Sequence, residues 1–372
     1  MSPALSLDIF GLIADHLDED DKSSILHFAL VSRALRDLIE PKLYRRVELH
    51  LACTIGIESS VEQTKSAKFL QALKIGRNTR HVEELVVFSF EGYETHDTAI
   101  NEILPLLPRL RSLTYKTQRS RSFFLPTSAP FSLKRLVYTN DYLKDSSLTT
   151  ELRAFLRQQP TINHLDLFTA IPESILPPAS LPELRILHGH LIHIHPWLTA
   201  QPRHLSHLWI SGLGGEAAER TIAKHIITKP DQLQSVKFFR CDSKHTLPES
   251  QVSLASSLCN LELLELDPAL GPCEDFFDAM HHLIRSCRGH KLRGIRFHLV
   301  WPPLDGSVER ELLDSIPPLL FQAISSLRVV DFRVRHGESE RWHRVSEWDI
   351  PAKAIKRIWW NDEKWWHDWT QI

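Results

Sequence analysis

Hydrophobic residues in the first fifty positions recur at helical spacing. Ile9, Leu12, Ile13 and Leu17 fall at i, i+3, i+4 and i+8, which lays one apolar stripe along a first helix. Between residues 25 and 39 the apolar positions occupy almost every side of a helix, so the pattern predicts a second helix that is buried on nearly all sides. A segment of this size closes only a marginal core. Its surplus apolar surface must therefore be covered by another protein or by the rest of the chain.

A second hydrophobic pattern recurs after residue 51. It consists of an aliphatic residue, two variable residues, an aliphatic, one variable residue, and an aliphatic or aromatic. It covers residues 82–87, 110–115, 133–138, 162–167, 205–210, 233–238, 261–266, 292–297, 327–332 and 355–360, with a partial copy at 184–187. The copies follow one another at steps of 21 to 35 residues, which bracket the leucine-rich-repeat period of roughly 20 to 29. The alternation that ends each phrase predicts a short strand with one side turned inward.

Helical patterns lie between these strands. They cover residues 61–75, 98–107, 147–156, 216–227, 274–287 and 308–324. Strands and helices in alternation imply parallel strands with right-handed crossovers, and units of this length stack into a curved solenoid. Regular leucine-rich repeats place an asparagine after the strand, and most copies here lack one, so the expected solenoid is irregular. The predicted fold class is α/β, with a parallel concave sheet and outer helices.

Seven of the ten tryptophans fall in the last 31 residues, from Trp342 to Trp369. Large aromatic faces cover an open solenoid core efficiently, so residues 341–372 are expected to form the last repeat and a C-terminal cap. A ligand-binding rim is the other interpretation. The predicted segments are then an N-terminal helical domain at 1–50, the solenoid at 51–340, and the cap.

Composition and charge narrow the function classes. A formal net charge of −2 and the lack of a long Lys/Arg cluster argue against nucleic acid as the main partner. No run approaches the roughly 18 apolar residues of a membrane span, and Asp8 and Asp15 interrupt the N-terminal apolar run as no secretory signal does. The five cysteines form no C-x-x-C pair, so reduced thiols are expected and no zinc site. These features favour the cytoplasm or the nucleus.

The opening stretch resembles an F-box. The positions that carry the resemblance are Leu5 and Asp8, Ile13 and Leu17, the core Val31-Ser32-Arg33, and the exit Leu43-Tyr44-Arg45. Ser6 stands where the family has proline, and Leu35 where an aromatic is common. With its repeats, the chain looks like a fungal-type F-box protein with an irregular leucine-rich-repeat-like region.

The resemblance implies a three-helix F-box and a substrate-recognition subunit of an SCF-type cullin-RING ubiquitin ligase, without a cofactor or a catalytic residue of its own. The F-box would dock on a Skp-family adaptor, and through it on cullin and RING subunits, while the solenoid captures a target protein. Carried over from the motif, the adaptor-binding residues are Leu5, Leu7, Ile9, Leu17, Val31, Leu35, Leu38 and Leu43. The alternative is a leucine-rich-repeat scaffold that joins proteins without a ligase.

The residue between the last two aliphatics of each phrase should point to the concave sheet face, which solenoids use for binding. Aromatic and arginine side chains dominate interfaces. The predicted target-binding residues at and near these positions are Phe168, His188, Trp209, Phe239, Arg296 and Trp359. Cover by loops or by the C-terminal segment is the competing interpretation for some of them.

One stretch suggests different chemistry. His188, His190, His193 and His195 form two His-x-His pairs, which could place imidazoles on one strand face as metal sites do. No acidic or histidine partner at a recognisable spacing accompanies them, so solvated or packed histidines are expected and no metal. A metal-dependent enzyme stays as a third class of function.

Overall fold

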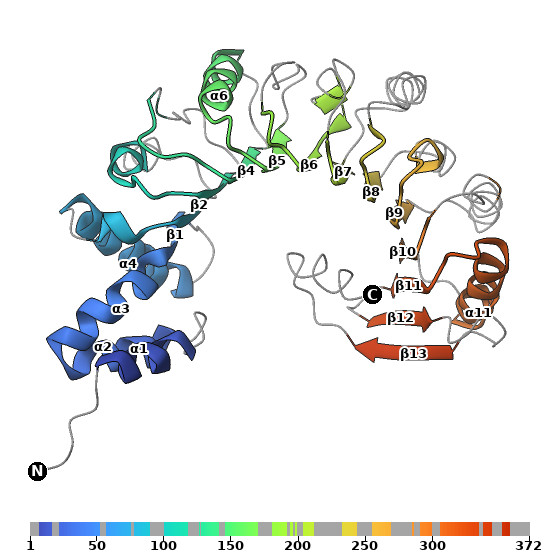
Figure 1. Ribbon diagram of the computed structural model, residues 1–372, viewed down its shortest axis with the longest axis horizontal. Helices are drawn as coiled ribbons and strands as arrows, with labels where there is room; N and C mark the ends of the chain where they lie inside the picture. The colour runs from blue at the N-terminus through green and yellow to red at the C-terminus, as the bar shows by residue number, and fades with distance from the viewer. Residues whose placement is uncertain are drawn as a thin grey trace, which may run out of the picture. The chain divides into compact units, whose positions relative to one another are not determined.

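A computed structural model of the chain divides into two compact units, Met1–Leu184 (unit 1) and Arg185–Ile372 (unit 2) (Figure 1). The structure describes residues 7–16, 22–52, 57–75, 78–89, 100–117, 126, 128–140, 146–169, 181–191, 194–195, 198, 204–211, 233–243, 255–268, 285, 291–299, 306–334, 338–343 and 352–357. Every structural statement below concerns these residues.

Unit 1 begins with three helices and continues into parallel strands. The helices are α1 (Leu7–His16), α2 (Lys22–Val31) and α3 (Arg33–Arg45). The elements that follow are β1 (Arg46–Ala52), α4 (Ile57–Lys74), the 3-10 turn η1 (Thr79–His81), β2 (Glu84–Ser89), the 3-10 turn η2 (Leu104–Leu106), β3 (Ser112–Thr117), β4 (Arg135–Asn140), α6 (Ser146–Gln158) and β5 (His164–Thr169). Strands β1 to β5 pair in chain order, each parallel to the next.

Strand β1 was not among the expected repeats. It crosses the predicted boundary at residue 50 and pairs with β2 from Arg46 onward. Helix α3 ends at Arg45, so no residue separates the helices from the sheet. Tyr44 stacks on Phe69 of α4 with ring centroids 5.9 Å apart, and the amide of Glu83 donates to the Arg45 carbonyl at 2.9 Å. The helical segment is therefore packed directly on the start of the sheet.

Most of the hydrophobic phrases form a turn followed by a strand. The amide of the first aliphatic donates to the carbonyl three residues earlier, as in Val82 to Thr79, Leu110 to Leu107 and Ile162 to Gln159, at 3.2 to 3.3 Å. The strand begins two residues later, and the next two aliphatics of the phrase fill the core, as Leu85 and Val87 do with no exposure. The predicted alternation is thus confirmed, and the first aliphatic belongs to the turn.

Successive repeats are joined by a shared acceptor. In unit 1 the carbonyl of Arg111 accepts from the amides of both Lys134 and Arg135, at 2.7 and 3.0 Å, and Glu83 and Lys134 repeat the arrangement. In unit 2 the carbonyls of Arg185, Ser206, Lys237, Glu262 and Arg293 do the same. These hydrogen bonds satisfy two consecutive amide groups just before or at the start of each strand.

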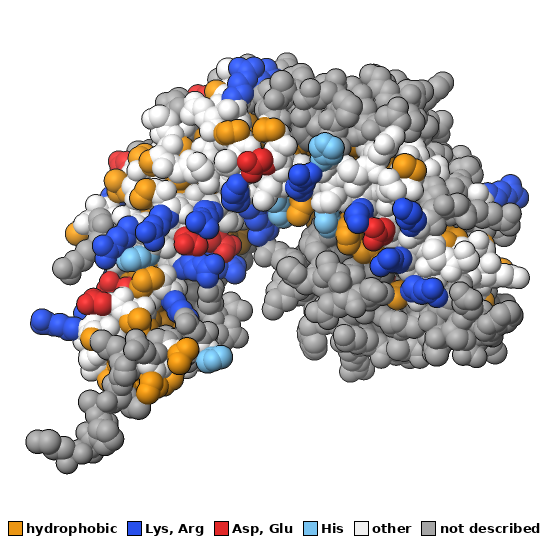
Figure 2. Space-filling model, in the orientation of Figure 1, with side chains coloured by type: hydrophobic (Ala, Val, Ile, Leu, Met, Phe, Trp, Pro, Cys, Tyr) orange, Lys and Arg blue, Asp and Glu red, His pale blue; other side chains and the backbone are white. Residues whose placement is uncertain are grey.

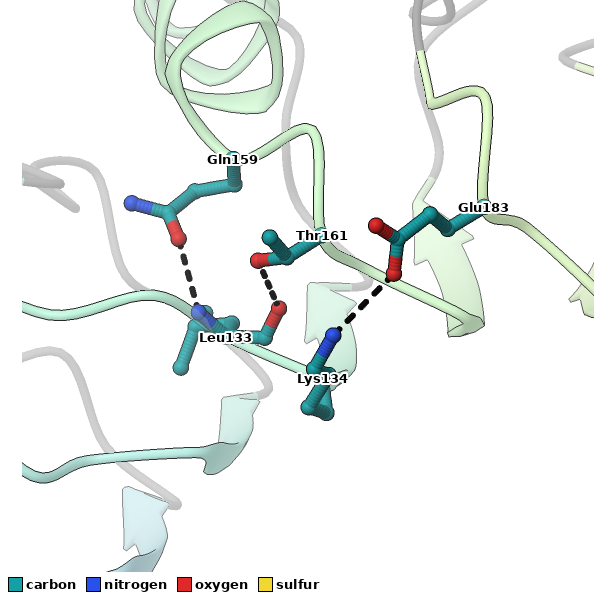
Figure 3. A network of polar contacts seen from close by, with 5 residues as sticks. All are labelled: Leu133, Lys134, Gln159, Thr161 and Glu183. Carbon is teal, nitrogen blue, oxygen red and sulfur yellow. Dashed lines mark hydrogen bonds and ion pairs between the residues drawn. The ribbon is translucent and has the colours of Figure 1, made fainter.

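A side chain replaces the turn carbonyl at β4 (Figure 3). The buried amide of Gln159 accepts from Leu133 N–H through Oε1 at 2.8 Å. The same amide donates to the Phe131 carbonyl at 3.3 Å. Thr161 Oγ1 donates to the Leu133 carbonyl at 2.8 Å, so two residues of the next repeat fix this entry. Beside them Lys134 pairs with Glu183 at 3.0 Å.

Unit 2 continues the parallel pattern and then changes. Its elements are β6 (Ile186–Gly189), β7 (His207–Ser211), β8 (Phe238–Ser243), β9 (Leu263–Pro268), β10 (Gly294–Leu299), α11 (Gly306–Ala323), β11 (Val329–Val334), β12 (Glu338–His343) and β13 (Ala352–Arg357). Strands β6 to β11 are parallel, whereas β12 pairs antiparallel with β11 and β13 antiparallel with β12. The phrase at 355–360 is therefore not a further parallel repeat: residues 355–357 lie in the antiparallel strand β13, and residues 358–360 lie outside the described residues.

The predicted strand at 233–238 is displaced. Leu233 supplies the turn carbonyl for Val236 N–H at 3.1 Å, so Val236 is the first aliphatic of this repeat. Strand β8 accordingly begins at Phe238, and Phe239 pairs in register with the core residues Leu208 and Leu264. Phe239 and Cys241 are buried in the core, and Arg240 takes the position expected for Lys237.

The helix predictions are confirmed where the structure describes them. Residues 61–75, 147–156 and 308–324 correspond to α4, α6 and α11, each within a few residues at the ends. Helix α6 lies on one side of the strands of unit 1 in Figure 1. The patterns at 216–227 and most of 274–287 lie outside the described residues. The confirmed architecture is an α/β fold built on parallel strands and compatible with a solenoid.

Candidate interaction surfaces

The apolar stretch from residue 25 to 39 is two helices rather than one. Ser32 interrupts it with extended backbone angles (φ −156°, ψ 162°), and its Oγ accepts from Leu35 N–H at 3.2 Å, which caps α3. Ile25 and Ala29 of α2 pack against Ile39 of α3, with Phe28 and Leu43 beside them. The predicted single helix was apolar on nearly all sides. In the structure the same apolar residues belong to two short helices, each with a buried side and an exposed side.

The outward sides leave a large exposed apolar area on the three helices, which we call the N-terminal apolar surface. It consists of Ile9 (42% exposed), Leu12 (62%), Ile13 (41%), Leu26 (50%), Leu30 (64%), Val31 (71%) and Leu38 (38%). These are seven of the ten large hydrophobic side chains that are exposed in the described part of the chain. Figure 2 shows hydrophobic side chains on this part of unit 1. Such a concentration is typical of interaction sites, because single scattered exposed side chains are the ordinary state of a monomer.

The predicted adaptor-binding residues do not all lie on this surface. Ile9, Val31 and Leu38 do, whereas Leu35 is buried in the core and Leu43 is partly buried against the core of the three helices. Leu5, Leu17 and the side chain of Leu7 lie outside the described residues. Leu12, Leu26 and Leu30 are exposed residues that the motif comparison did not select. Their helical spacing from Ile9 and from each other was the available signal.

Each parallel strand turns two residues to the core and the residue between them to the other side, which we call the second face. In unit 1 the middle position on this face is held in register by Glu48, Val86, Thr114, Val137 and Asp166, and the three central residues are 5 to 6% exposed. Two residues along, the rings of His50 and Phe88 stack at 4.9 Å, and Lys116 Nζ lies 5.7 Å from the Phe88 ring centroid. Phe168 follows in the same row and is half-buried.

In unit 2 the same middle position carries a row of aromatic and charged side chains, which we call the charged row. Its members in register are His188, Trp209, Arg240, Glu265, Arg296 and Asp331. The His188 ring stacks on Trp209 with centroids 3.4 Å apart, and the Arg240 guanidinium lies 3.7 Å from the Trp209 centroid. Because β6 and β8 flank β7, the two neighbours occupy opposite faces of the indole.

The charges of this row are paired from strand to strand. Arg240 Nη1 lies 3.3 Å from Glu265 Oε1. Arg296 donates to Asp331 Oδ2 through Nε at 3.1 Å and through Nη2 at 2.8 Å. All four residues are at most 6% exposed. A buried charge needs such a partner, because desolvation costs several kcal/mol per ion.

The predicted target-binding residues are divided by this geometry. His188, Trp209 and Arg296 belong to the charged row, where Trp209 offers a target its edge rather than its face. Phe239 is on the core side, which corrects its expected position. Phe168 lies in unit 1 on the second face, and Trp359 lies outside the described residues. Sequence reasoning selected neither Arg240, hidden by the register shift, nor Glu265 and Asp331, which partner the two arginines.

The beginnings of the strands in unit 1 carry many cations. Arg45 pairs with Glu83 at 3.3 Å, and Arg46 approaches Glu84 at 3.9 Å. Arg80 Nε donates to His81 Nε2 at 3.1 Å, which requires that nitrogen to be unprotonated. Burial lowers the pKa of the His81 imidazole, and the nearby Arg80 and Arg109 guanidiniums lower this pKa further, against an opposing effect of the Glu40 carboxylate.

The histidine stretch gives no metal centre within the described residues. His188 is stacked on Trp209, His190 and His195 are half-buried, and His193 lies outside the description. No group of three His, Cys, Asp or Glu side chains in the described part of the chain could hold a metal ion. Among the same residues, no helix is long and apolar enough to cross a membrane.

No protein-family model matches this chain, and a search of curated proteins finds no significant match. The resemblance to an F-box therefore depends on the residues quoted above, together with the physical character of the N-terminal helices.

Proposed function

We propose that this chain is a substrate receptor of an SCF-type ubiquitin ligase, in which the N-terminal helices dock on a Skp-family adaptor and the repeats capture a target protein. The observation that carries the proposal is the N-terminal apolar surface. The three helices enclose a core of few residues and leave seven large hydrophobic side chains exposed. A partner that covers them would supply the burial that the segment lacks.

The exposed residues are arranged as a groove-binding partner would require. Leu26 and Leu30 are four residues apart on α2, and Ile9, Leu12 and Ile13 share the spacing of one side of α1. Apolar anchors spaced along a helix face are typical of helix-in-groove docking. The charged residues of the chain have no assigned catalytic role in this proposal, because the partner subunits would carry out ubiquitin transfer.

The second part of the proposal assigns target capture to the sheet. The half-buried side chains of the second face, such as Phe88, Lys116 and Phe168, are available for contact in unit 1. In unit 2 the edge of the half-buried Trp209 is available, while His188 and Arg240 hold the faces of its ring. The rest of that row supports the surface and contributes little contact area.

The test uses the full chain and a purified Skp-type adaptor in a titration. A Leu30→Glu, Val31→Glu variant places two charges where the adaptor would bury hydrophobic side chains, so affinity should fall by about two orders of magnitude. These residues are 64% and 71% exposed, so the fold should survive, as circular dichroism will show.

The matched control is Ile75→Glu, because Ile75 is 80% exposed and lies after α4, outside the N-terminal helices. Adaptor affinity of this variant should equal that of the original chain. If the unchanged chain fails to bind the adaptor at all, the ligase proposal is lost and the scaffold alternative replaces it. Equal losses in both variants would show that the contact is non-specific.

A further inference from the structure

Lys and Arg side chains line the edge of unit 1 where its strands begin. The residues are Arg45, Arg46, Arg80, Arg109, Arg111, Lys134 and Arg135, against the carboxylates Glu83, Glu84 and Glu183. Every strand entry from β1 to β4 contributes at least one cation. Figure 2 shows Lys and Arg side chains gathered on this unit. The sequence contains no basic run, because the repeats bring these residues together from separate segments.

Three of the arginines are not neutralised. The three carboxylates of the edge are engaged by Arg45, Arg46 and Lys134. Among the described residues no carboxylate lies within ion-pair distance of Arg80, Arg109 or Arg111, and all three are exposed. Arg80 and Arg109 both lie near His81, where burial lowers the pKa of the imidazole most and the two guanidiniums lower this pKa further. The Glu40 carboxylate opposes them at the same ring. Arg111 N–H donates to the Glu83 carbonyl at 2.8 Å, at the entry of the neighbouring strand.

The spacing of the edge suits an extended chain. Neighbouring strands lie about 4.8 Å apart, so a segment that crosses the strand entries meets a new basic position at each step. An extended peptide advances about 3.3 Å per residue and repeats its side-chain direction every second residue. Arginine binds carboxylate and phosphate through two parallel hydrogen bonds, which favours anionic groups over neutral ones.

We propose that Arg80, Arg109 and Arg111 form a docking site for an extended acidic segment of the target protein, rich in carboxylates. This inference rests on the proposed function and adds the chemistry by which the receptor selects its target. The basic edge continues over Lys134 and Arg135 along the repeats, so the segment would extend away from the N-terminal helices.

The strand entries of unit 2 also carry basic residues, but these residues do not form a continuous series as they do in unit 1. Lys291, Arg293 and Arg328 are exposed at the entries of β10 and β11, but Glu262 stands at the entry of β9 and binds Lys237 at 2.9 Å. The basic positions are interrupted there. A variant of these three residues therefore changes the net charge equally without altering the proposed site.

The experiment measures fluorescence anisotropy of labelled ten-residue peptides with the full chain, in the absence of adaptor. One peptide alternates Glu and Ser, a second carries phosphoserine in place of Glu, and a third carries Gln. The Glu peptide should bind, more weakly as salt rises, and the Gln peptide should not. Binding of the phosphoserine peptide without binding of the Glu peptide would overturn the proposal in favour of a phosphorylated segment.

The R80Q, R109Q, R111Q variant should weaken binding by at least about tenfold, from the modest contribution of each exposed charge pair. The K291Q, R293Q, R328Q control should change it less than twofold. Equal losses in both variants would overturn the proposal in favour of diffuse charge attraction, and the absence of binding by the Glu peptide would also overturn it.

Two further arms separate this inference from other partners. Adaptor affinity of the R80Q, R109Q, R111Q variant should be unchanged, so a loss there would assign the edge to the adaptor and overturn the proposal. Single-stranded RNA of ten nucleotides should bind less tightly than the Glu peptide, and the reverse order would also overturn it. Because the peptide assay contains no adaptor, its outcome is independent of whether the N-terminal helices engage a ligase.

Discussion

The middle position of the second face differs between the central strands of unit 1 and the strands of unit 2. On β2 to β4, Val86, Thr114 and Val137 are small and bear no charge, although Glu48 on β1 and Asp166 on β5 stand at the same position. In unit 2 the corresponding residues are the aromatic and charged members of the charged row. The three uncharged residues and the charged row are largely buried. The same strand geometry therefore accommodates two solutions: side chains that lose little on desolvation, or charges that must each find a neighbour on the next strand. The second solution couples adjacent repeats and makes them dependent on each other.

The largest loss of stability should follow from removing one partner of a buried ion pair in unit 2. Asp331→Ala leaves the Arg296 guanidinium without the carboxylate that accepts its two hydrogen bonds. The free energy of unfolding should fall by about 3 to 5 kcal/mol, because the Arg296 guanidinium stays buried and loses the carboxylate that it contacts through two nitrogens. Urea unfolding, followed by circular dichroism and tryptophan fluorescence, measures the loss.

The control for that change replaces both partners. In Arg296→Met, Asp331→Leu both charges of this pair are removed, and stability should return to within about 1 kcal/mol of the original chain. A double variant as unstable as Asp331→Ala would show that the loss comes from packing and that the ion pair is not its cause.

A smaller loss should follow from removing the aromatic member of the charged row. Trp209→Ala deletes the ring that separates His188 from Arg240, and stability should decrease by about 2 to 4 kcal/mol. Trp209→Phe keeps an aromatic face for both neighbours and should recover a substantial part of the loss. Comparison of the two melting temperatures checks this prediction, and identical values for Ala and Phe would contradict the stacked arrangement.

The smallest effect is expected in unit 1. Thr114 stands between Val86 and Val137, so Thr114→Val makes these three central positions uniformly apolar and should change the free energy of unfolding by less than about 1 kcal/mol. Thr114→Asp introduces a charge at the same place and should cost more than Thr114→Val by about 2 kcal/mol or more. The two variants unfolded side by side in urea would show whether this row tolerates charge as unit 2 does.

Most strands could be placed from the sequence because the hydrophobic phrase has a constant position relative to the turn and the strand. Its first aliphatic closes a turn, and the strand begins two residues later, as from Val82 to β2 and from Leu327 to β11. The failure at β8 has a specific cause. Val236 can serve as the second aliphatic after Leu233 or as the first before Phe239, and only the hydrogen bonds of the turn decide between these registers.

Other features depend on information that a linear pattern lacks. Strand β1 has Tyr44 where other phrases begin with an aliphatic, and β12 is antiparallel and has no phrase at all. The prediction of one helix that is apolar on all sides was wrong, because Ser32 divides the stretch into two helices. Ser32 caps α3 with its side chain at extended backbone angles, which the apolar pattern does not reveal. The pairing of Arg240 with Glu265 and of Arg296 with Asp331 joins residues from separate repeats, so it requires the correct register of every intervening strand.

The direct junction of α3 and β1 has a mechanical consequence. A receptor that joins its binding parts through a flexible linker holds its two ligands at a distribution of distances, set by linker length. Here Arg45 and Arg46 are consecutive, and the contacts of Tyr44 with Phe69 and of Arg45 with Glu83 brace the corner between helices and sheet. Within unit 1, a partner bound to the helices and a partner bound to the sheet would therefore be held at a fixed distance. That distance is set by the number of repeats between the two binding positions.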